Sequence, residues 1–193
     1  MTTRAARALL SVLAVCGAPV VGGCGGHQAT GGPLVAPNGH GWAMSQPVGF
    51  EFTDGMETLH LNGNRSATLR KVELVGSDGL ELLGVALVKP GRDVGTVQEI
   101  DGWPARDRHI NPSDVVSPGI GATFTPARGN PLGQSYELLV GMKVVRAGYL
   151  VRDGLRITYA VNGTSYTRYF PAQLTVCTSA RFEKHGSCPF PDG

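Results

Sequence analysis

The sequence predicts an all-β domain, an antiparallel sandwich with an immunoglobulin-like layout, and three observations lead to this class. From residue 48 onward, short apolar or alternating runs recur between turn residues. Glycine and proline number 28 and 13 among 193 residues, which suits short strands joined by many turns. No segment shows the amphipathic period of a helix. A small Greek-key β-barrel is the alternative architecture.

Eight runs match the strand pattern, and one pair of them predicts a hairpin. The run 155–161 alternates cleanly and places Tyr159 on its apolar face. Asn162-Gly163 follows directly and predicts a two-residue turn to the next strand, because both central residues of such a turn take positive φ. No cysteine pair flanks a core tryptophan, so the likeness to antibody domains is one of layout only. The expected strands are 48–52, 57–61, 68–75, 80–88, 136–145, 155–161, 165–170 and 173–177.

The N-terminal residues divide as a secretory signal does. Arg4 and Arg7 precede a largely apolar stretch over 8–21, which is shorter than the roughly 20 residues that span a bilayer. The stretch ends in Val21-Gly22-Gly23-Cys24, an aliphatic residue and two small residues before a cysteine. An ordinary cleaved signal peptide and an uncleaved N-terminal anchor are the alternative interpretations.

The pattern Val21-Gly22-Gly23-Cys24 resembles the lipobox of bacterial lipoproteins, in particular the uncharacterised small secreted lipoproteins of high-GC Gram-positive (actinobacterial) type. The resemblance covers residues 1–24 only. It implies that Cys24 carries a diacylglycerol and becomes the new N-terminus. The protein is then expected outside the cytoplasm, anchored to the cell membrane by the lipid on Cys24.

The chain is expected to divide into three parts. Residues 1–23 form the lipoprotein signal peptide, and 24–47 comprise the lipidated cysteine and a flexible Gly/Pro-rich tether. With random-coil scaling this tether spans about 25 Å. Residues 48–193 form a single β-sandwich domain, with a long loop at 90–134 and a disulfide loop at the C-terminal end.

Two cysteines remain for the domain after the signal and the lipid are assigned. Cys177 and Cys188 are predicted to form a disulfide, as an isolated pair in an exported domain usually does. The alternative is a metal site in which His185 joins the two thiols, although a fourth ligand is missing nearby.

Charge argues against nucleic acid as a partner. Removing Arg4 and Arg7 with the signal leaves as many basic as acidic residues, 15 of each. A nucleic-acid-binding domain normally carries a basic surplus on one face. No polybasic run indicates binding to an anionic membrane surface either.

The loop 90–134 contains the candidate partner-contact residues. Trp103, Arg106, Arg108 and His109 combine aromatic and charged groups, and Trp and Arg are favoured at interaction hot spots. The alternative is a tryptophan packed over the end of the sandwich with solvated charges around it.

The sequence shows no catalytic motif, and we predict no catalytic residue, no cofactor-binding residue and no metal ligand. A nucleophile elbow, a P-loop and a zincin motif are all missing. Glu51, Asp54 and Glu57 are interpreted as solvated carboxylates near a turn rather than as an acid–base pair.

The leading functional hypothesis is a non-enzymatic binding or interaction module of the cell envelope. It would be held at the membrane by its lipid and would dock an envelope protein or polymer through the long loop. A small-ligand or metal carrier lipoprotein is the first alternative. An enzyme whose site is assembled from residues far apart in sequence is the second.

Overall fold

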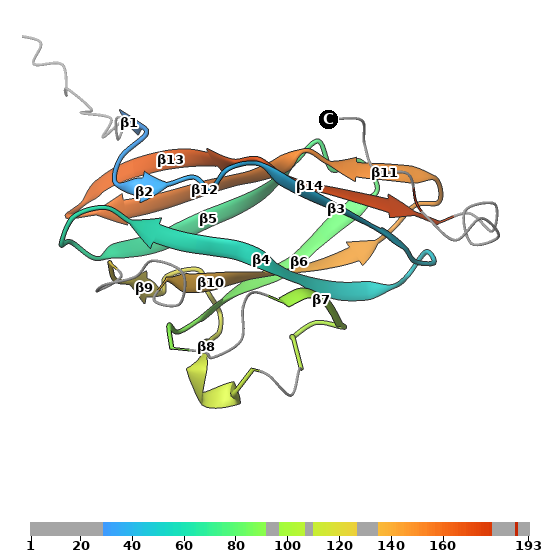
Figure 1. Cartoon of the computed structure of the whole chain (residues 1–193), viewed down its shortest axis with the longest axis horizontal. Helices are drawn as coiled ribbons and strands as arrows, with labels where there is room; N and C mark the ends of the chain where they lie inside the picture. The colour runs from blue at the N-terminus through green and yellow to red at the C-terminus, as the bar shows by residue number, and fades with distance from the viewer. Residues whose placement is uncertain (1–28, 92–96, 107–109, 127–134, 179–187, 189–193) are drawn as a thin grey trace, which may run out of the picture.

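The computed structural model describes residues 29–91, 97–106, 110–126, 135–178 and 188, which form a β-sandwich (Figure 1). The described part of the chain contains no α-helix and one short 3-10 helix, η1 (Pro112–Asp114). Three sheets are present, and none of them closes on itself as a barrel would. The predicted sandwich is therefore confirmed.

The strands are ordered so that segments near the two ends of the chain pair with each other. The first sheet is β1 (Ala29–Thr30), β13 (Thr164–Phe170), β12 (Gly154–Val161), β5 (Ala67–Val75) and β9 (Thr123–Phe124). The second sheet is β2 (Leu34–Val35), β4 (Glu51–Leu61), β10 (Tyr136–Val144), β6 (Leu80–Val88) and β8 (Val115–Val116), with β7 (Val97–Asp101) also on β4. The third is β11 (Tyr149–Arg152), β14 (Ala172–Cys177) and β3 (His40–Ser45).

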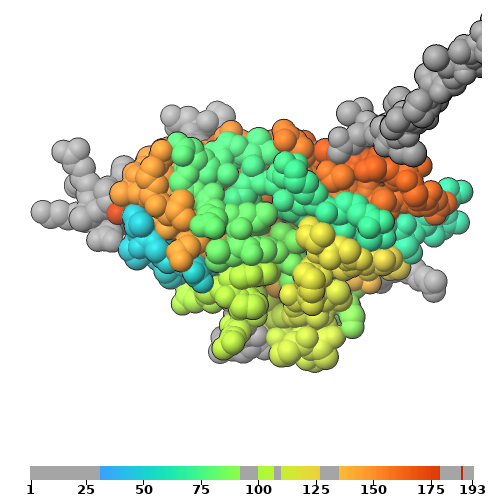
Figure 2. All heavy atoms as spheres, turned by 180° about the vertical axis from the view of Figure 1, so that it is seen from behind, coloured from blue at the N-terminus to red at the C-terminus, as the bar shows by residue number. Residues whose placement is uncertain are grey.

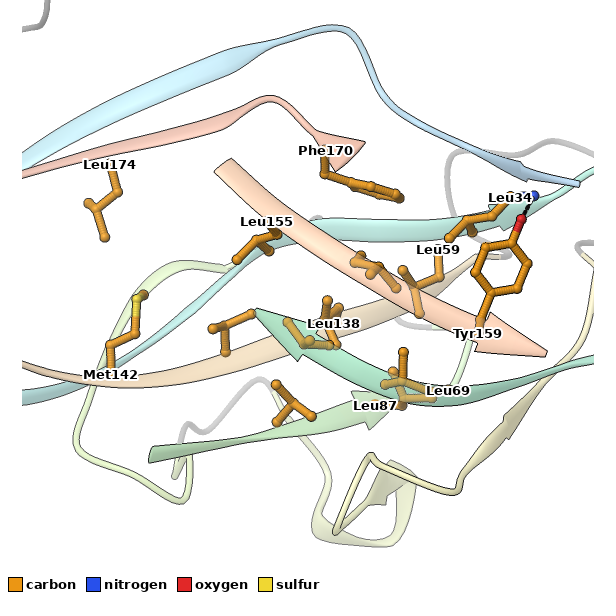
Figure 3. Packing of buried hydrophobic residues seen from close by; sticks show 14 of the residues in the cluster. Leu34, Leu59, Leu69, Leu87, Leu138, Met142, Leu155, Tyr159, Phe170 and Leu174 are labelled. Atoms are coloured by element: carbon orange, nitrogen blue, oxygen red, sulfur yellow. Dashed lines mark hydrogen bonds between the residues drawn. The ribbon is translucent and has the colours of Figure 1, made fainter. Parts of the chain in front are cut away.

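The main core is formed by inward-facing residues of all three sheets, with the second sheet on one side and the first and third on the other. Leu155, Ile157 and Tyr159 point inward from β12 at alternating positions, as the sequence pattern predicts, and each is fully buried. Leu59, Leu69 and Leu138 from the neighbouring strands pack in the same cluster (Figure 3).

The predicted hairpin between β12 and β13 is confirmed. Asn162 has φ 49° and Gly163 has φ 80°, and the two strands pair from Val161 and Thr164 outward. Positive φ at both central residues matches the right-handed twist of the strands, which explains why Asn-Gly occupies this turn.

The predicted flexible tether is wrong over residues 29–45, because this segment belongs to the sandwich. Leu34, Trp42 and Met44 are buried in the main core. β2 pairs with β4, and β3 pairs with β14 in parallel over its whole length. Two short strands in this Gly/Pro-rich segment thus add an edge strand each to the second and third sheets, and the apolar residues of both strands face the core.

The predicted strand 57–61 and the end of the predicted strand 48–52 belong to one strand, β4 (Glu51–Leu61), while residues 48–50 precede it, and the turn expected between the two is absent. The sheet bends there through a β-bulge, since two residues of β4 lie opposite Leu139 alone. Asp54-Gly55 resembles a turn signal in sequence, but here it belongs to the bulge.

The segment that follows β7 covers the outer face of the second sheet. Figure 2 shows this segment, in yellow and yellow-green, along the lower side of the green strands. Ile110 from this segment and Ile100 of β7 are buried against Val88 and Leu139 of the sheet, and Trp103 packs beside them. The predicted long loop therefore builds a second, smaller core.

The predicted disulfide is present between Cys177, at the end of β14, and Cys188. The bond leaves neither thiol for the alternative metal site, and His185 of that site lies outside the described residues.

Reduction of this disulfide is expected to lower the free energy of unfolding by roughly 2–3 kcal/mol. The bond joins residues 11 apart in sequence, and closing a loop of this size restricts the unfolded chain by about that amount. Urea denaturation with and without reductant measures the difference, and a Cys177→Ser/Cys188→Ser variant serves as the control. Equal stability of the oxidised and reduced protein would contradict this expectation.

Candidate functional site

Strand β4 carries two carboxylates into the interior of the sandwich. The bulge places Asp54 opposite Val140 and Glu57 opposite Leu138, so both side chains lie on the inner face although they are three residues apart. Each is fully buried. The interpretation of Asp54 and Glu57 as solvated is therefore wrong, whereas Glu51 remains partly exposed and pairs with Lys143 at 3.0 Å.

Asp54 forms an ion pair with Arg152, the last residue of β11. Its Oδ2 lies 2.8 Å from Nη2 of Arg152, and neither side chain is exposed at all. The other carboxylate oxygen accepts a hydrogen bond of 3.1 Å from the backbone N–H of Met56 in the bulge. Arg152 donates further hydrogen bonds, from Nε to the carbonyl of Ala172 at 3.1 Å and from Nη1 to the sulfur of Met142 at 3.7 Å.

Glu57 pairs with His40 from β3. The distance from Nε2 of His40 to Oε1 of Glu57 is 3.1 Å. The Glu57 side chain is fully buried, while the His40 side chain is 27% exposed. His40, Asp54, Glu57 and Arg152 form a group that we call the buried charge cluster, and it connects β4 to β3 and β11 of the third sheet.

The charges of this cluster balance only when His40 is protonated. Two carboxylates face one guanidinium, which leaves one negative charge for the imidazole to neutralise. The hydrogen bond to Glu57 raises the pKa of His40 above its ordinary value, burial opposes this, and the charges of Glu57 and Asp54 raise it further. The positive charge of Arg152 lowers it to a smaller extent.

The stability of the protein is expected to fall as the pH rises through the pKa of His40 in the folded state. A group with a raised pKa in the folded state binds its proton more tightly there than in the unfolded chain. Its contribution is complete below the unfolded value near 6.5 and disappears above the folded pKa. Urea denaturation at several pH values tests this, with His40→Gln as the variant that should lose this component. A wild-type profile identical to that of His40→Gln would contradict the assignment.

The chemistry of the cluster is that of a structural ion network. A carboxylate that orients an imidazole is one half of an acid–base device, but such a device also needs a nucleophile or substrate group beside the ring. Among the residues that the structure describes, no three potential metal ligands of the His, Cys, Asp or Glu type gather at one point. The cluster therefore holds three strands together and links their packing to the protonation of His40.

The structure describes two of the four predicted partner-contact residues, Trp103 and Arg106. The Trp103 ring is only partly exposed and lies over two glycines of the second sheet: a Cβ on Gly84 would approach it to 3.0 Å, and one on Gly141 would overlap with its Cδ2 atom. Arg106 is exposed to solvent. Arg108 and His109 lie outside the described residues, as does the predicted lipidation site, Cys24.

The charge cluster had a signal in the sequence. Counting by two from Phe52 places Asp54 on the apolar face, and counting back from Leu59 places Glu57 there as well. The first count places even-numbered residues on the apolar face, and the second places odd-numbered residues there. A β-bulge between Asp54 and Glu57 adds one residue to the strand and makes both counts correct.

No protein family, curated protein or solved structure matches this chain. None of the described segments is a helix long and apolar enough to cross a bilayer.

Proposed function

We propose that the protein is an extracytoplasmic lipoprotein, anchored to the cell membrane through a lipid on Cys24. The observation that carries the proposal is Val21-Gly22-Gly23-Cys24 at the end of the apolar stretch 8–21. The disulfide between Cys177 and Cys188 supports an oxidising compartment, because such bonds persist outside the cytoplasm.

The lipid on Cys24 is tested by mass spectrometry of the protein purified from membranes. The mature wild-type chain is expected to begin at Cys24 and to carry the mass of its acyl chains. Cys24→Ser should remain unprocessed or leave the membrane fraction, while Cys16→Ser should behave like the wild type. A mature protein without lipid would overturn the proposal.

We further propose that the anchored sandwich acts as a non-enzymatic binding module for an envelope protein or polymer. The segment over the second sheet supports this role, because it presents Arg106 and the apolar Ile120, which is 44% exposed, on a rigid support. Trp103 contributes to this surface by fixing the segment against Gly84 and Gly141.

Cross-linking in native membranes, followed by mass spectrometry, tests the binding role. One reproducible partner is expected with the wild type and should be lost with Arg106→Ala, whereas Lys71→Ala, on the exposed face of the first sheet, should retain it. If no partner is found above background, the binding role is wrong, whereas the lipid anchor on Cys24 is tested separately and is not affected.

A further inference from the structure

The first described residues define the end of the sandwich from which the anchor emerges. Ala29 pairs with Tyr166 and Thr30 with Thr167, and β1 runs parallel to β13. β13 leads away from the hairpin turn at 162–163, so β1 does too. The chain before Ala29 therefore emerges on the side of this turn.

A hydrogen-bonded contact fixes the chain just after this point. The hydroxyl of Tyr159 donates to the carbonyl of Gly31 at 2.9 Å and accepts from the N–H of Leu34 at 3.0 Å (Figure 3). Burial raises the pKa of Tyr159, which keeps this hydroxyl protonated. The Tyr159 and Tyr166 rings stack with centroids 5.6 Å apart. A Cβ on Gly32 would lie 2.5 Å from the Tyr159 hydroxyl, so the backbone is held close to both rings.

The connection to the anchor is short. Gly25, Gly26, His27 and Gln28 alone stand between Cys24 and Ala29. A fully extended chain covers at most about 3.6 Å per residue, so Cys24 lies within roughly 18 Å of Ala29. Strand β4, with 11 residues, is about 36 Å long at a rise of roughly 3.3 Å per residue. The lipid thus holds the hairpin end closer to the bilayer than the opposite end.

Lys89, Asp114 and Glu137 lie at the same end of the sandwich, but on the β10, β6 and β8 side of the second sheet, away from the anchor exit. Around the anchor exit itself, the hairpin end carries only basic charge among its described residues. We define it as the residues around the anchor exit, 31–36, 60–70, 121–126 and 157–168, and both views of the molecule place the β12–β13 hairpin and the β4–β5 turn together there (Figures 1 and 2). These ranges contain no Asp or Glu. They contain Arg65, Arg70 and Arg168, and no described residue forms an ion pair with any of the three.

The opposite end has the reverse character. Its turns carry carboxylates, and two of its basic groups are paired: Arg146 lies 2.6 Å from Asp78, and Lys143 lies 3.0 Å from Glu51. The balanced charge of the mature chain is therefore distributed unevenly along the sandwich. Four uncharged residues separate Arg65 from Arg70, and Arg168 comes 98 residues after Arg70, so the sequence shows no polybasic run here.

We propose that the hairpin end docks on the anionic phospholipid headgroups of the bilayer that holds the lipid on Cys24. This inference rests on the proposed lipidation, which brings the hairpin end to the surface. Phosphate groups attract the guanidinium groups of Arg65, Arg70 and Arg168, which no described carboxylate neutralises. Docking turns the opposite end, with its carboxylates, away from the membrane.

The experiment uses the full mature lipidated protein in phospholipid vesicles. Because Cys24 is acylated and Cys177 is bonded to Cys188, a cysteine introduced at Asn64 (hairpin end) or Ala147 (opposite end) is the single free thiol for a fluorophore. Lipids with a nitroxide on the headgroup quench a fluorophore near the surface. With phosphatidylglycerol present, the Asn64→Cys probe is expected to be quenched strongly and the Ala147→Cys probe weakly.

The arginines are tested by neutralising them together. Arg65→Gln/Arg70→Gln/Arg168→Gln should lose the dependence of quenching on phosphatidylglycerol, since each basic group near an anionic surface changes the docked fraction relative to the undocked by about fivefold. A control with equal charge loss outside this end, Arg106→Gln/Lys143→Gln/Arg146→Gln, should keep it. Near-ultraviolet circular dichroism verifies that both variants are folded.

The outcomes separate this inference from the proposal beneath it. A protein without lipid, which does not join the vesicles, overturns the lipoprotein assignment. A lipidated, vesicle-bound protein quenched equally at Asn64→Cys and Ala147→Cys overturns the docking alone. Equal quenching of the Asn64→Cys probe with and without phosphatidylglycerol also overturns the docking, because the short connection to Cys24 alone would then explain the proximity to the bilayer. Protection of the Asn64→Cys thiol from labelling in native membranes but not in vesicles would overturn the docking on lipid headgroups and indicate that a protein contacts the hairpin end.

Discussion

Replacing Arg152 with methionine is expected to destabilise the protein by about 3–5 kcal/mol. The change removes the guanidinium that lies 2.8 Å from Asp54 while both carboxylates of the buried charge cluster remain. A buried charge without its partner accounts for most of this cost, and the carbonyl of Ala172 loses a donor as well. Urea denaturation followed by tryptophan fluorescence measures the loss.

Two companion variants show whether the cost comes from the unpaired charge. Asp54→Leu/Arg152→Met removes both partners, so it should be clearly more stable than the sum of the single variants predicts. Lys143→Met breaks the half-exposed pair with Glu51 and should cost at most about 1 kcal/mol. Additive single changes in the double variant would show that the two groups do not interact as the geometry indicates.

Replacing Trp103 with alanine is expected to cost about 3–4 kcal/mol, because the ring fills the space over Gly84 and Gly141 and helps to bury the second core. Arg106→Ala, three residues along and exposed, should change stability by less than about 0.5 kcal/mol. Thermal unfolding of the two variants side by side measures the contrast. A Trp103→Ala protein as stable as Arg106→Ala would mean that the ring is not needed to hold the covering segment.

The contact between Trp103 and Gly141 can be tested by itself. Gly141→Ala introduces a Cβ where the Trp103 ring lies, so it should be destabilising in the wild type and much less so in Trp103→Ala. The result of this double-mutant cycle also affects how a lost binding partner is interpreted. Loss of a partner in Trp103→Ala alone would not identify a contact, since the segment that carries Arg106 is disturbed as well.

The local features of the fold were predictable from the sequence. Alternation placed Tyr159 inward, Asn162-Gly163 predicted the hairpin, and two cysteines predicted the disulfide. The first two depend on residues that are neighbours in sequence, and the disulfide follows because Cys177 and Cys188 are the two cysteines that remain for the domain.

The remaining features depend on partners that are distant in sequence. A bulge within β4 shifted the alternation, so Asp54-Gly55 looked like a turn although the strand continues. His40 stood in a segment without a strand pattern, and its pairing with Glu57 required β14 to hold β3 in place. Arg152 follows an ordinary apolar run, and nothing nearby in sequence indicates that its partner is Asp54.

The pairing of β3 with β14 has a consequence for the order in which the chain can fold. The hydroxyl of Ser45 donates to the carbonyl of Cys177, 132 residues away, and β3 has no other described strand beside it. Such non-local contacts are formed late and slowly, since the entropy of closing a large loop must be offset first. During synthesis, β3 can therefore pair only after β14 has been made, and only then does His40 reach its place beside Glu57. Completion of the interior therefore depends on β14, the last of the described strands to be synthesised.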